Sequence, residues 1–244
     1  MNKDLKRCLL GGVYLAAGIV LMAGVAGVFL LDVHFYTGGG FFWEDSLTEK
    51  TQAALLFLSA ILFTCGAWLK KERFLPGMLL TAMALLGGVR ELDYLFDKVV
   101  HGFWKLPAAI IVLWALVMVW RRRKEIFRSF AGEVVRPYWG ILCAGFCCVA
   151  VFSRLFGMRM NWEKMLEVYW EKVSGSVYDS MAAGGITGSH EGWEQSIGYD
   201  WRSMTRSIRR FAEEGTELAG YALLFLAAIG FFVSCLNERR EGEE

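Results

Sequence analysis

Six long apolar runs alternate with short charged segments along this chain of 244 residues. A helix needs roughly 20 mostly apolar residues to cross a hydrocarbon core of about 30 Å, and each run is close to that length. The pattern therefore predicts an all-α fold, a six-helix transmembrane bundle. The expected spans are residues 8–31, 51–69, 74–94, 104–120, 137–156 and 217–236.

The third apolar run is shorter than a membrane span requires, so the charged residues that follow it are expected close to lipid. The apolar part, 74–89, would rise only about 24 Å as a helix at 1.5 Å per residue. We therefore expect the third helix to continue through Arg90, Glu91 and Asp93. Charged groups so close to lipid should turn toward the protein and pair.

The segment 157–215, between spans five and six, also has a helical pattern. Six apolar residues recur at helical spacing while Glu and Lys fill the opposite face, which is typical of a helix lying in the membrane interface. A second helical pattern begins near Tyr199 and is expected to run without a break into span six. We interpret 157–215 as an outer cap on a single membrane domain, residues 1–244. The six apolar residues are Trp162, Met165, Leu166, Tyr169, Trp170 and Val173.

The distribution of Lys and Arg predicts the orientation of the bundle. The segments at one side carry 14 of these residues, whereas the short segments at the other side carry four. Cytoplasmic loops carry an excess of Lys and Arg, so both termini are expected in the cytoplasm and the protein is expected in the plasma (inner) membrane. The four residues on the outer side are Lys50, Arg90, Lys98 and Lys105.

Composition narrows the classes of partner. Hydrophobic residues make up 55% of the chain and the formal net charge is +1, so the overall charge gives no reason to expect a nucleic-acid partner. Membrane lipid is the expected partner. Small residues at Gly12, Ala16, Ala23 and Gly27 could also pack span one against a protein partner or a second copy of the chain.

The acidic residues gather on the expected outer side, where 17 of the 25 lie. Several occur where a span begins or ends. For example, Glu49 lies at the start of span two and Glu217 at the start of span six. Arg154 closes span five. We expect these side chains and their neighbours to converge under the interfacial helix if the bundle is compact. The converging set is Glu49, Glu91, Asp93, His101, Glu213 and Glu217.

Three interpretations of this cluster remain open. It could be a salt-bridge network that holds helix ends together. It could be a divalent-metal site of His101, Glu49 and Glu217, although no HxxxH or ExxH ligand pair is present and any cofactor is unknown. It could also be an acid/base site acting on a lipid head group. For that site the catalytic candidates are Glu49, Glu91, Asp93, His101 and Glu217, with Arg90, Arg154 and Glu213 as binding residues.

The leading functional hypothesis is an outward-facing polar pocket that binds or processes a lipid or another amphiphile. The rival is a noncatalytic accessory or structural subunit of a membrane complex, in which the same charges only lock helices or dock a partner. A small-solute transporter is third, since charges at the outer end do not supply the sites near the midplane that transporters use.

Two short motifs carry a resemblance to known proteins. The segment 43–49, Trp-Glu-Asp-Ser-Leu-Thr-Glu, and the segment 90–93, Arg-Glu-Leu-Asp, resemble parts of uncharacterised bacterial polytopic inner-membrane proteins with an E-D-x-x-x-E helix start. The resemblance implies a polytopic membrane fold and no particular activity. Glu44 and Ser59 also resemble positions in alkaline ceramidase-like membrane hydrolases, but spans five and six contain no histidine that could supply the zinc ligands of that family.

Overall fold

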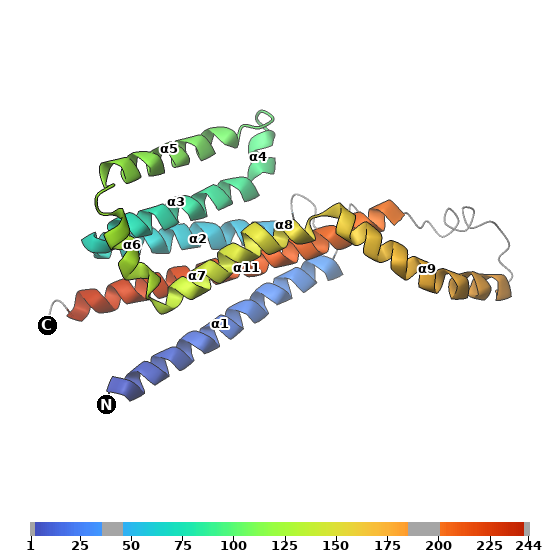
Figure 1. Cartoon of the computed structure of the whole chain (residues 1–244), viewed down its shortest axis with the longest axis horizontal. Helices are drawn as coiled ribbons and strands as arrows, with labels where there is room; N and C mark the ends of the chain where they lie inside the picture. The colour runs from blue at the N-terminus through green and yellow to red at the C-terminus, as the bar shows by residue number, and fades with distance from the viewer. Residues whose placement is uncertain (1–2, 36–45, 185–200, 242–244) are drawn as a thin grey trace.

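The computed structural model describes residues 3–35, 46–184 and 201–241, and within these ranges the chain forms helices and no strand (Figure 1). Part of the 43–49 motif, including Glu44 and Asp45, lies outside the described residues. The helices are α1 (Lys3–His34), α2 (Leu47–Leu69), η1 (Lys71–Arg73), α3 (Phe74–Glu91), α4 (Asp93–Asp97), α5 (Lys105–Arg121), α6 (Ile126–Val134), α7 (Pro137–Cys147), η2 (Cys148–Phe152), α8 (Ser153–Phe156), α9 (Arg159–Ala183) and α11 (Trp201–Glu241).

In the described part of the chain, five helical stretches are long and apolar enough to cross a membrane, judged by length and composition. They correspond to predicted spans one, two, three, five and six. The predicted fourth span, 104–120, coincides with α5, which has 17 residues and rises about 26 Å. The five stretches are Gly11–His34, Leu47–Leu69, Lys71–Glu91, Pro137–Phe156 and Thr205–Arg240.

The long helix α11 is the centre of the fold. It packs against α1, α2 and α7, while α2 packs against α3 and α3 against α5. The N and C ends of the chain lie at the same end of the bundle (Figure 1), which we call the termini end. Buried apolar side chains join these helices, for example Phe63 of α2 and Phe231 of α11, whose ring centroids are 5.5 Å apart.

Helices α7 and α11 approach each other at two glycines. A Cβ atom at Gly220 would lie 2.6 Å from Val149 Cγ2 and 3.0 Å from the carbonyl oxygen of Gly145. Since real Cβ atoms do not come that close to other heavy atoms, a side chain at Gly220 would push the two helices apart. Small residues at such crossings are typical of helices that pack tightly in membranes.

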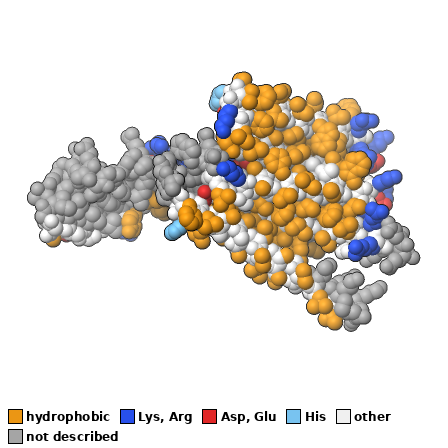
Figure 2. Space-filling model, turned by 180° about the vertical axis from the view of Figure 1, so that it is seen from behind, with side chains coloured by type: hydrophobic (Ala, Val, Ile, Leu, Met, Phe, Trp, Pro, Cys, Tyr) orange, Lys and Arg blue, Asp and Glu red, His pale blue; other side chains and the backbone are white. Residues whose placement is uncertain are grey.

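The lateral surface of the bundle is apolar. Figure 2 shows hydrophobic side chains over the sides of the bundle, with Lys and Arg gathered at the termini end. Much of this surface belongs to α1 and α5, where Leu15, Val20, Ile110 and Leu113 are each at least 60% exposed. Exposed apolar area on this scale is expected where a protein surface faces lipid or a partner rather than water.

One expected helix boundary needs correction. The third helix does not continue through Asp93: α3 ends at Glu91, and the separate helix α4 begins at Asp93. The fifth span is helical throughout but is interrupted by the π-helical turn η2. The prediction of a continuous helix from about residue 199 into span six is confirmed by α11.

The segment after span five is helical, as predicted. Helix α9 begins at Arg159 and ends at Ala183, beyond the last apolar residue of the predicted interfacial pattern, Val173. It packs against α11 and extends from the end of the bundle opposite the termini (Figure 1). We call that end the pocket end.

Candidate functional site

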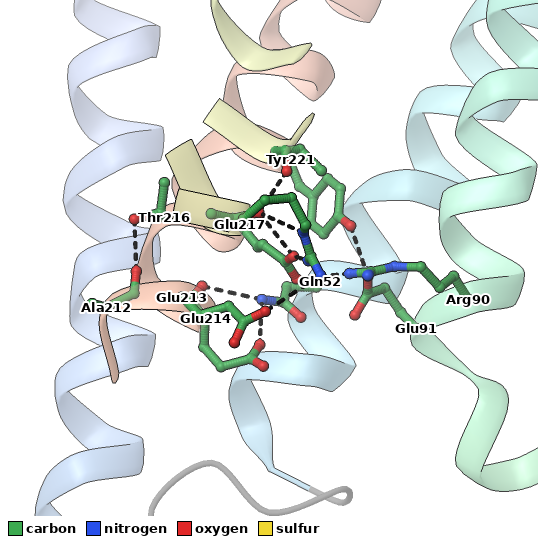
Figure 3. Close-up of polar contacts among 12 residues, drawn as sticks. Gln52, Arg90, Glu91, Ala212, Glu213, Glu214, Thr216, Glu217 and Tyr221 are labelled. Carbon is green, nitrogen blue, oxygen red and sulfur yellow. Dashed lines mark hydrogen bonds and ion pairs between the residues drawn. The ribbon is translucent and has the colours of Figure 1, made fainter. Parts of the chain in front are cut away.

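Charged side chains from α3, α8 and α11 meet at the pocket end, around the carboxylate of Glu217 (Figure 3). Glu217 is 2% exposed, although it is ionisable and directly precedes an apolar stretch of α11. A buried carboxylate needs opposite charge and hydrogen bonds to offset the loss of water. The positions of the neighbouring helix ends supply both.

Two arginines from different helices hold Glu217. Arg90 of α3 donates from Nη2 to Glu217 Oε2 at 2.8 Å, and Arg154 of α8 forms an ion pair with the other carboxylate oxygen, Oε1. Ser153 also donates to Oε1, at 3.1 Å. Glu217 therefore connects α3 to α8 through α11.

Each arginine has a second acidic partner. Arg90 Nη2 lies 2.8 Å from Glu91 Oε1, which also accepts a hydrogen bond of 2.7 Å from the hydroxyl of Tyr221. Arg154 Nη1 lies 3.3 Å from Glu213 Oε1. The result is a chain of alternating charges, which we call the outer network. Its members are Glu91, Arg90, Glu217, Arg154 and Glu213.

The turn η2 contributes to the position of Arg154. A π-helical turn contains more residues than an α-helical one, so it changes the direction in which later side chains point. Here it directly precedes Ser153 and Arg154, which both contact Glu217. π-helical turns occur frequently at functional sites.

Helix α2 contributes a buried amide to the same region. Gln52 is fully buried, and its Nε2 donates to the backbone oxygen of Glu214 at 3.2 Å and to its carboxylate at 3.1 Å. The start of α2 is held by Asp32 of α1, whose carboxylate accepts from the backbone amides of Leu47 (3.1 Å) and Thr48 (2.8 Å). A carboxylate at this position satisfies amides that have no partner within the helix.

A polar cavity of about 290 Å³ opens beside the outer network. In the part of the chain that the structure describes, its charged lining comprises six carboxylates and four guanidinium groups, so negative charge is in excess there. Burial, together with the neighbouring carboxylates of Asp97 and Glu91, raises the pKa of Asp93 above its usual value. The lining residues are Glu49, Arg90, Glu91, Asp93, Arg154, Arg209, Arg210, Glu213, Glu214 and Glu217.

Seven of the eight site residues selected from the sequence line this cavity. All the catalytic candidates except His101 are present, as are all three binding candidates. The structure therefore brings together residues that lie up to 168 positions apart between Glu49 and Glu217. The seven are Glu49, Glu91, Asp93, Glu217, Arg90, Arg154 and Glu213.

His101 does not lie in the charged cluster where the sequence placed it. Its side chain is 97% exposed, and its Nδ1 lies 2.9 Å from a carboxylate oxygen of Asp97. The reason is the break after Glu91, because α4 and the turn at Gly102, with φ of 80°, lead the chain toward α5. His101 consequently follows α4 and does not line the cavity.

The expected metal site of His101, Glu49 and Glu217 is not formed by the described side chains. Among them, no group of three or more His, Cys, Asp or Glu residues is placed to hold a metal ion. His101 lies outside the cavity, and both oxygens of Glu217 are occupied by arginines.

Ser153 and Tyr221, which were not predicted from the sequence, complete the outer network. Tyr221 lies four residues after Glu217, on the same face of α11, and this spacing was a usable signal. Ser153 lies next to Arg154, but its direction depends on the π-helical turn, for which the sequence has no recognised signal.

A second buried network, also missed, lies at the termini end. Arg73, 5% exposed, donates to both carboxylate oxygens of Glu133 at 2.7 Å and to the hydroxyl of Tyr138 at 2.8 Å. Its Nη1 donates to Ser234 of α11 at 2.8 Å, and the guanidinium lies 4.5 Å from the centre of the Phe231 ring. We call this set the inner network. Its polar groups are satisfied by one another, which indicates a structural role.

The outer network differs from the inner one in its access to solvent. The side chains of Arg90 and Arg154 are 42% and 46% exposed, and they border a cavity, whereas Arg73 and Glu133 are enclosed. The outer site can therefore exchange part of its charge pairing for a ligand.

Comparisons with protein-family models, with curated proteins and with solved structures found no match to this chain.

Proposed function

We propose that this chain is an integral protein of the plasma (inner) membrane whose polar cavity faces outward and binds or processes a lipid or another amphiphile. In this proposal the protein has six spans and both termini are cytoplasmic. The cavity at the pocket end then lies at the level of the outer head groups.

The position of α5 supports counting it as a membrane span, the fourth along the chain, which brings the total to six. It packs against α3 and runs beside it in the opposite direction (Figure 1). Its side chains are apolar and exposed, among them Leu106, Ile110, Leu113 and Leu116. A helix of about 26 Å with an apolar surface is suited to a lipid environment, and a modest mismatch in length costs fractions of a kcal/mol per ångström.

The observation that carries the functional proposal is the cavity itself. A space of about 290 Å³ with ten charged lining residues lies at one end of a bundle whose sides are apolar. A ligand with a charged head and an apolar tail matches both surfaces at once. Such a molecule could place its head in the cavity while its tail stays along the helices.

Binding has firmer support than catalysis. Glu91 and Glu217 accept hydrogen bonds from arginines or Tyr221, so their carboxylate oxygens already have partners within the protein. Asp93 lines the cavity and has a raised pKa, which suits a group that exchanges a proton. If the bound amphiphile is processed, Asp93 is the residue placed to take part.

The test is to purify the full chain in an uncharged detergent, extract its bound lipids and identify them by mass spectrometry. Asp93→Asn removes a cavity charge that has no side-chain partner holding helices together in the described structure. Arg128→Gln, an exposed charge on α6, is the matched control. We expect Asp93→Asn to reduce or change the copurified lipid without lowering thermal stability, while Arg128→Gln leaves the lipid unchanged. An unaltered lipid complement in Asp93→Asn would count against the proposal.

The rival function, a noncatalytic structural subunit, is favoured by the extensive pairing in the outer network. Arg90, Glu217 and Arg154 each have charged partners without any ligand. Replacing Glu217 is expected to destabilise the protein under either function. Only the structural function predicts that Asp93→Asn leaves the lipid content unchanged, so the lipid measurement separates the two functions.

A further inference from the structure

A second cavity adjoins the first at Arg209. Its volume is about 190 Å³, and it is lined by three arginines and one threonine: Arg159, Thr205, Arg206 and Arg209. Arg209 also lines the larger cavity, so the two spaces share a wall. Among the described residues, the smaller lining contains no carboxylate, whereas the larger one has an excess of carboxylates. The pocket end thus has a cationic compartment directly beside an anionic one.

The cationic compartment has unused capacity to donate hydrogen bonds. Arg209 Nε is buried and has no hydrogen-bond partner. A buried donor without a partner is destabilising, and an anion accepting from this nitrogen would remove that cost. Guanidinium groups are well matched to phosphate oxygens, which they can contact in pairs.

The start of α9 adds to this preference for an anion. Arg159 is the first residue of α9, and Met158 before it provides no side-chain cap. The positive end of the helix dipole and the Arg159 guanidinium therefore occur together. Part of the Arg159 charge is met by an ion pair with Glu163, but an anion between α9 and α11 would be favoured by both groups.

From these observations we propose that the head group bound at the pocket end is a zwitterion with a phosphate joined to an amine. The phosphate would occupy the compartment of Arg159, Arg206 and Arg209, and the ammonium group would face the carboxylates of the larger cavity. Asp93, at the wall of that cavity, makes no hydrogen bond or ion pair with another side chain among the described residues. This inference rests on the proposed function and adds the chemical class of its ligand.

The experiment measures binding to the full chain in an uncharged detergent by intrinsic tryptophan fluorescence. The soluble probes are glycerophosphoethanolamine, inorganic phosphate and ethanolamine, and the lipid probes are short-chain phosphatidylethanolamine and phosphatidylglycerol in mixed micelles. We expect the phosphoamine probes to bind at least about tenfold more tightly than phosphate, ethanolamine or phosphatidylglycerol, since each charged contact contributes to affinity. The comparison of soluble and lipid probes separates a free phosphate compound from a lipid head group.

Two variants test the assignment of the compartments. Arg209→Gln should weaken phosphoamine binding about tenfold and leave ethanolamine binding unchanged. Asp93→Asn should weaken the binding of the phosphoamine and of ethanolamine and leave the binding of phosphate unchanged. Arg128→Gln should change the affinity for none of the three. Equal affinity for phosphate and the phosphoamine, or for the two lipids, would overturn the inference, as would the absence of binding by every probe.

These outcomes separate failure of this inference from failure of the proposed function. If a lipid copurifies in a manner that depends on Asp93 but contains no phosphoamine, the proposed function stands and the phosphoamine assignment is wrong. If no lipid depends on Asp93 and no probe binds, both are wrong.

Discussion

Replacing Glu217 with Gln tests whether the outer network stabilises the fold. The substitution keeps the size of the side chain and removes its charge. In the native protein Glu217 is 2% exposed, and its carboxylate forms ion pairs with Arg90 and Arg154 and accepts a hydrogen bond from Ser153. After the change, both guanidinium groups face a neutral amide whose NH₂ group cannot accept from them.

The size of the effect follows from burial and from the remaining partners. Removing one member of a fully buried ion pair typically costs about 3–5 kcal/mol. Here the arginines are 42% and 46% exposed, and each keeps an acidic neighbour, Glu91 at 2.8 Å or Glu213 at 3.3 Å. Solvent screening and these partners reduce the cost, so we expect a loss of about 2–3 kcal/mol in the free energy of unfolding.

The assay is reversible unfolding of the purified chain in mixed micelles, followed by helix content. Glu213→Gln is the matched control, because Glu213 is 21% exposed and contacts one arginine at 3.3 Å. Its expected loss is below about 1 kcal/mol. Wild-type stability of Glu217→Gln, or equal losses for both variants, would refute the reasoning that burial makes Glu217 the centre of the network.

Three further outcomes are expected. Gly220→Ala should destabilise the chain by about 1–3 kcal/mol through overpacking against Val149, and a wild-type unfolding midpoint would contradict the close helix contact. Glu133→Gln should cost about 3–5 kcal/mol, because it leaves the buried Arg73 with the more distant Glu238, at 3.6 Å, in place of the carboxylate at 2.7 Å; the same unfolding assay measures this, and a loss below that of Glu217→Gln would be inconsistent with it. The raised pKa of Asp93 means that the folded state binds more protons than the unfolded state between the usual and the raised pKa. Stability should therefore rise as pH falls through that window, and Asp93→Asn should remove this part of the pH dependence.

The sequence was sufficient for the parts of the fold that depend on hydrophobic length. Five of the expected spans coincide with helices long and apolar enough to cross a membrane, because the cost of exposing polar groups to hydrocarbon acts on whole segments. The same cost explains why the charges at helix ends converged. Glu217, placed directly before an apolar stretch, had to find partners, and Arg90 and Arg154 supply them.

The parts that the sequence did not predict depend on local backbone geometry and on pairing between distant residues. The end of α3 at Glu91 moved His101 out of the cluster, although the run of residues could equally continue as one helix. The inner network was missed because Arg73 and Glu133 were only counted among the charges of the expected cytoplasmic segments. Their burial depends on how α6 folds back beneath α3 and α7, which contact it.

The π-helical turn Cys148–Phe152 lies between the two parts of the fifth span. It sets how far one part is rotated about the helix axis relative to the other. Each residue of an α-helix advances the side chains by about 100°, and a π-helical turn fits one extra residue into about the same rotation. Deleting one residue from this turn and restoring regular α-helix would therefore keep both Gly145 against Gly220 and Arg154 near Glu217. Tightening the turn to regular α-helix at its present length would instead keep Gly145 against Gly220 and swing Arg154 away from Glu217, which would abolish the site without changing its residues.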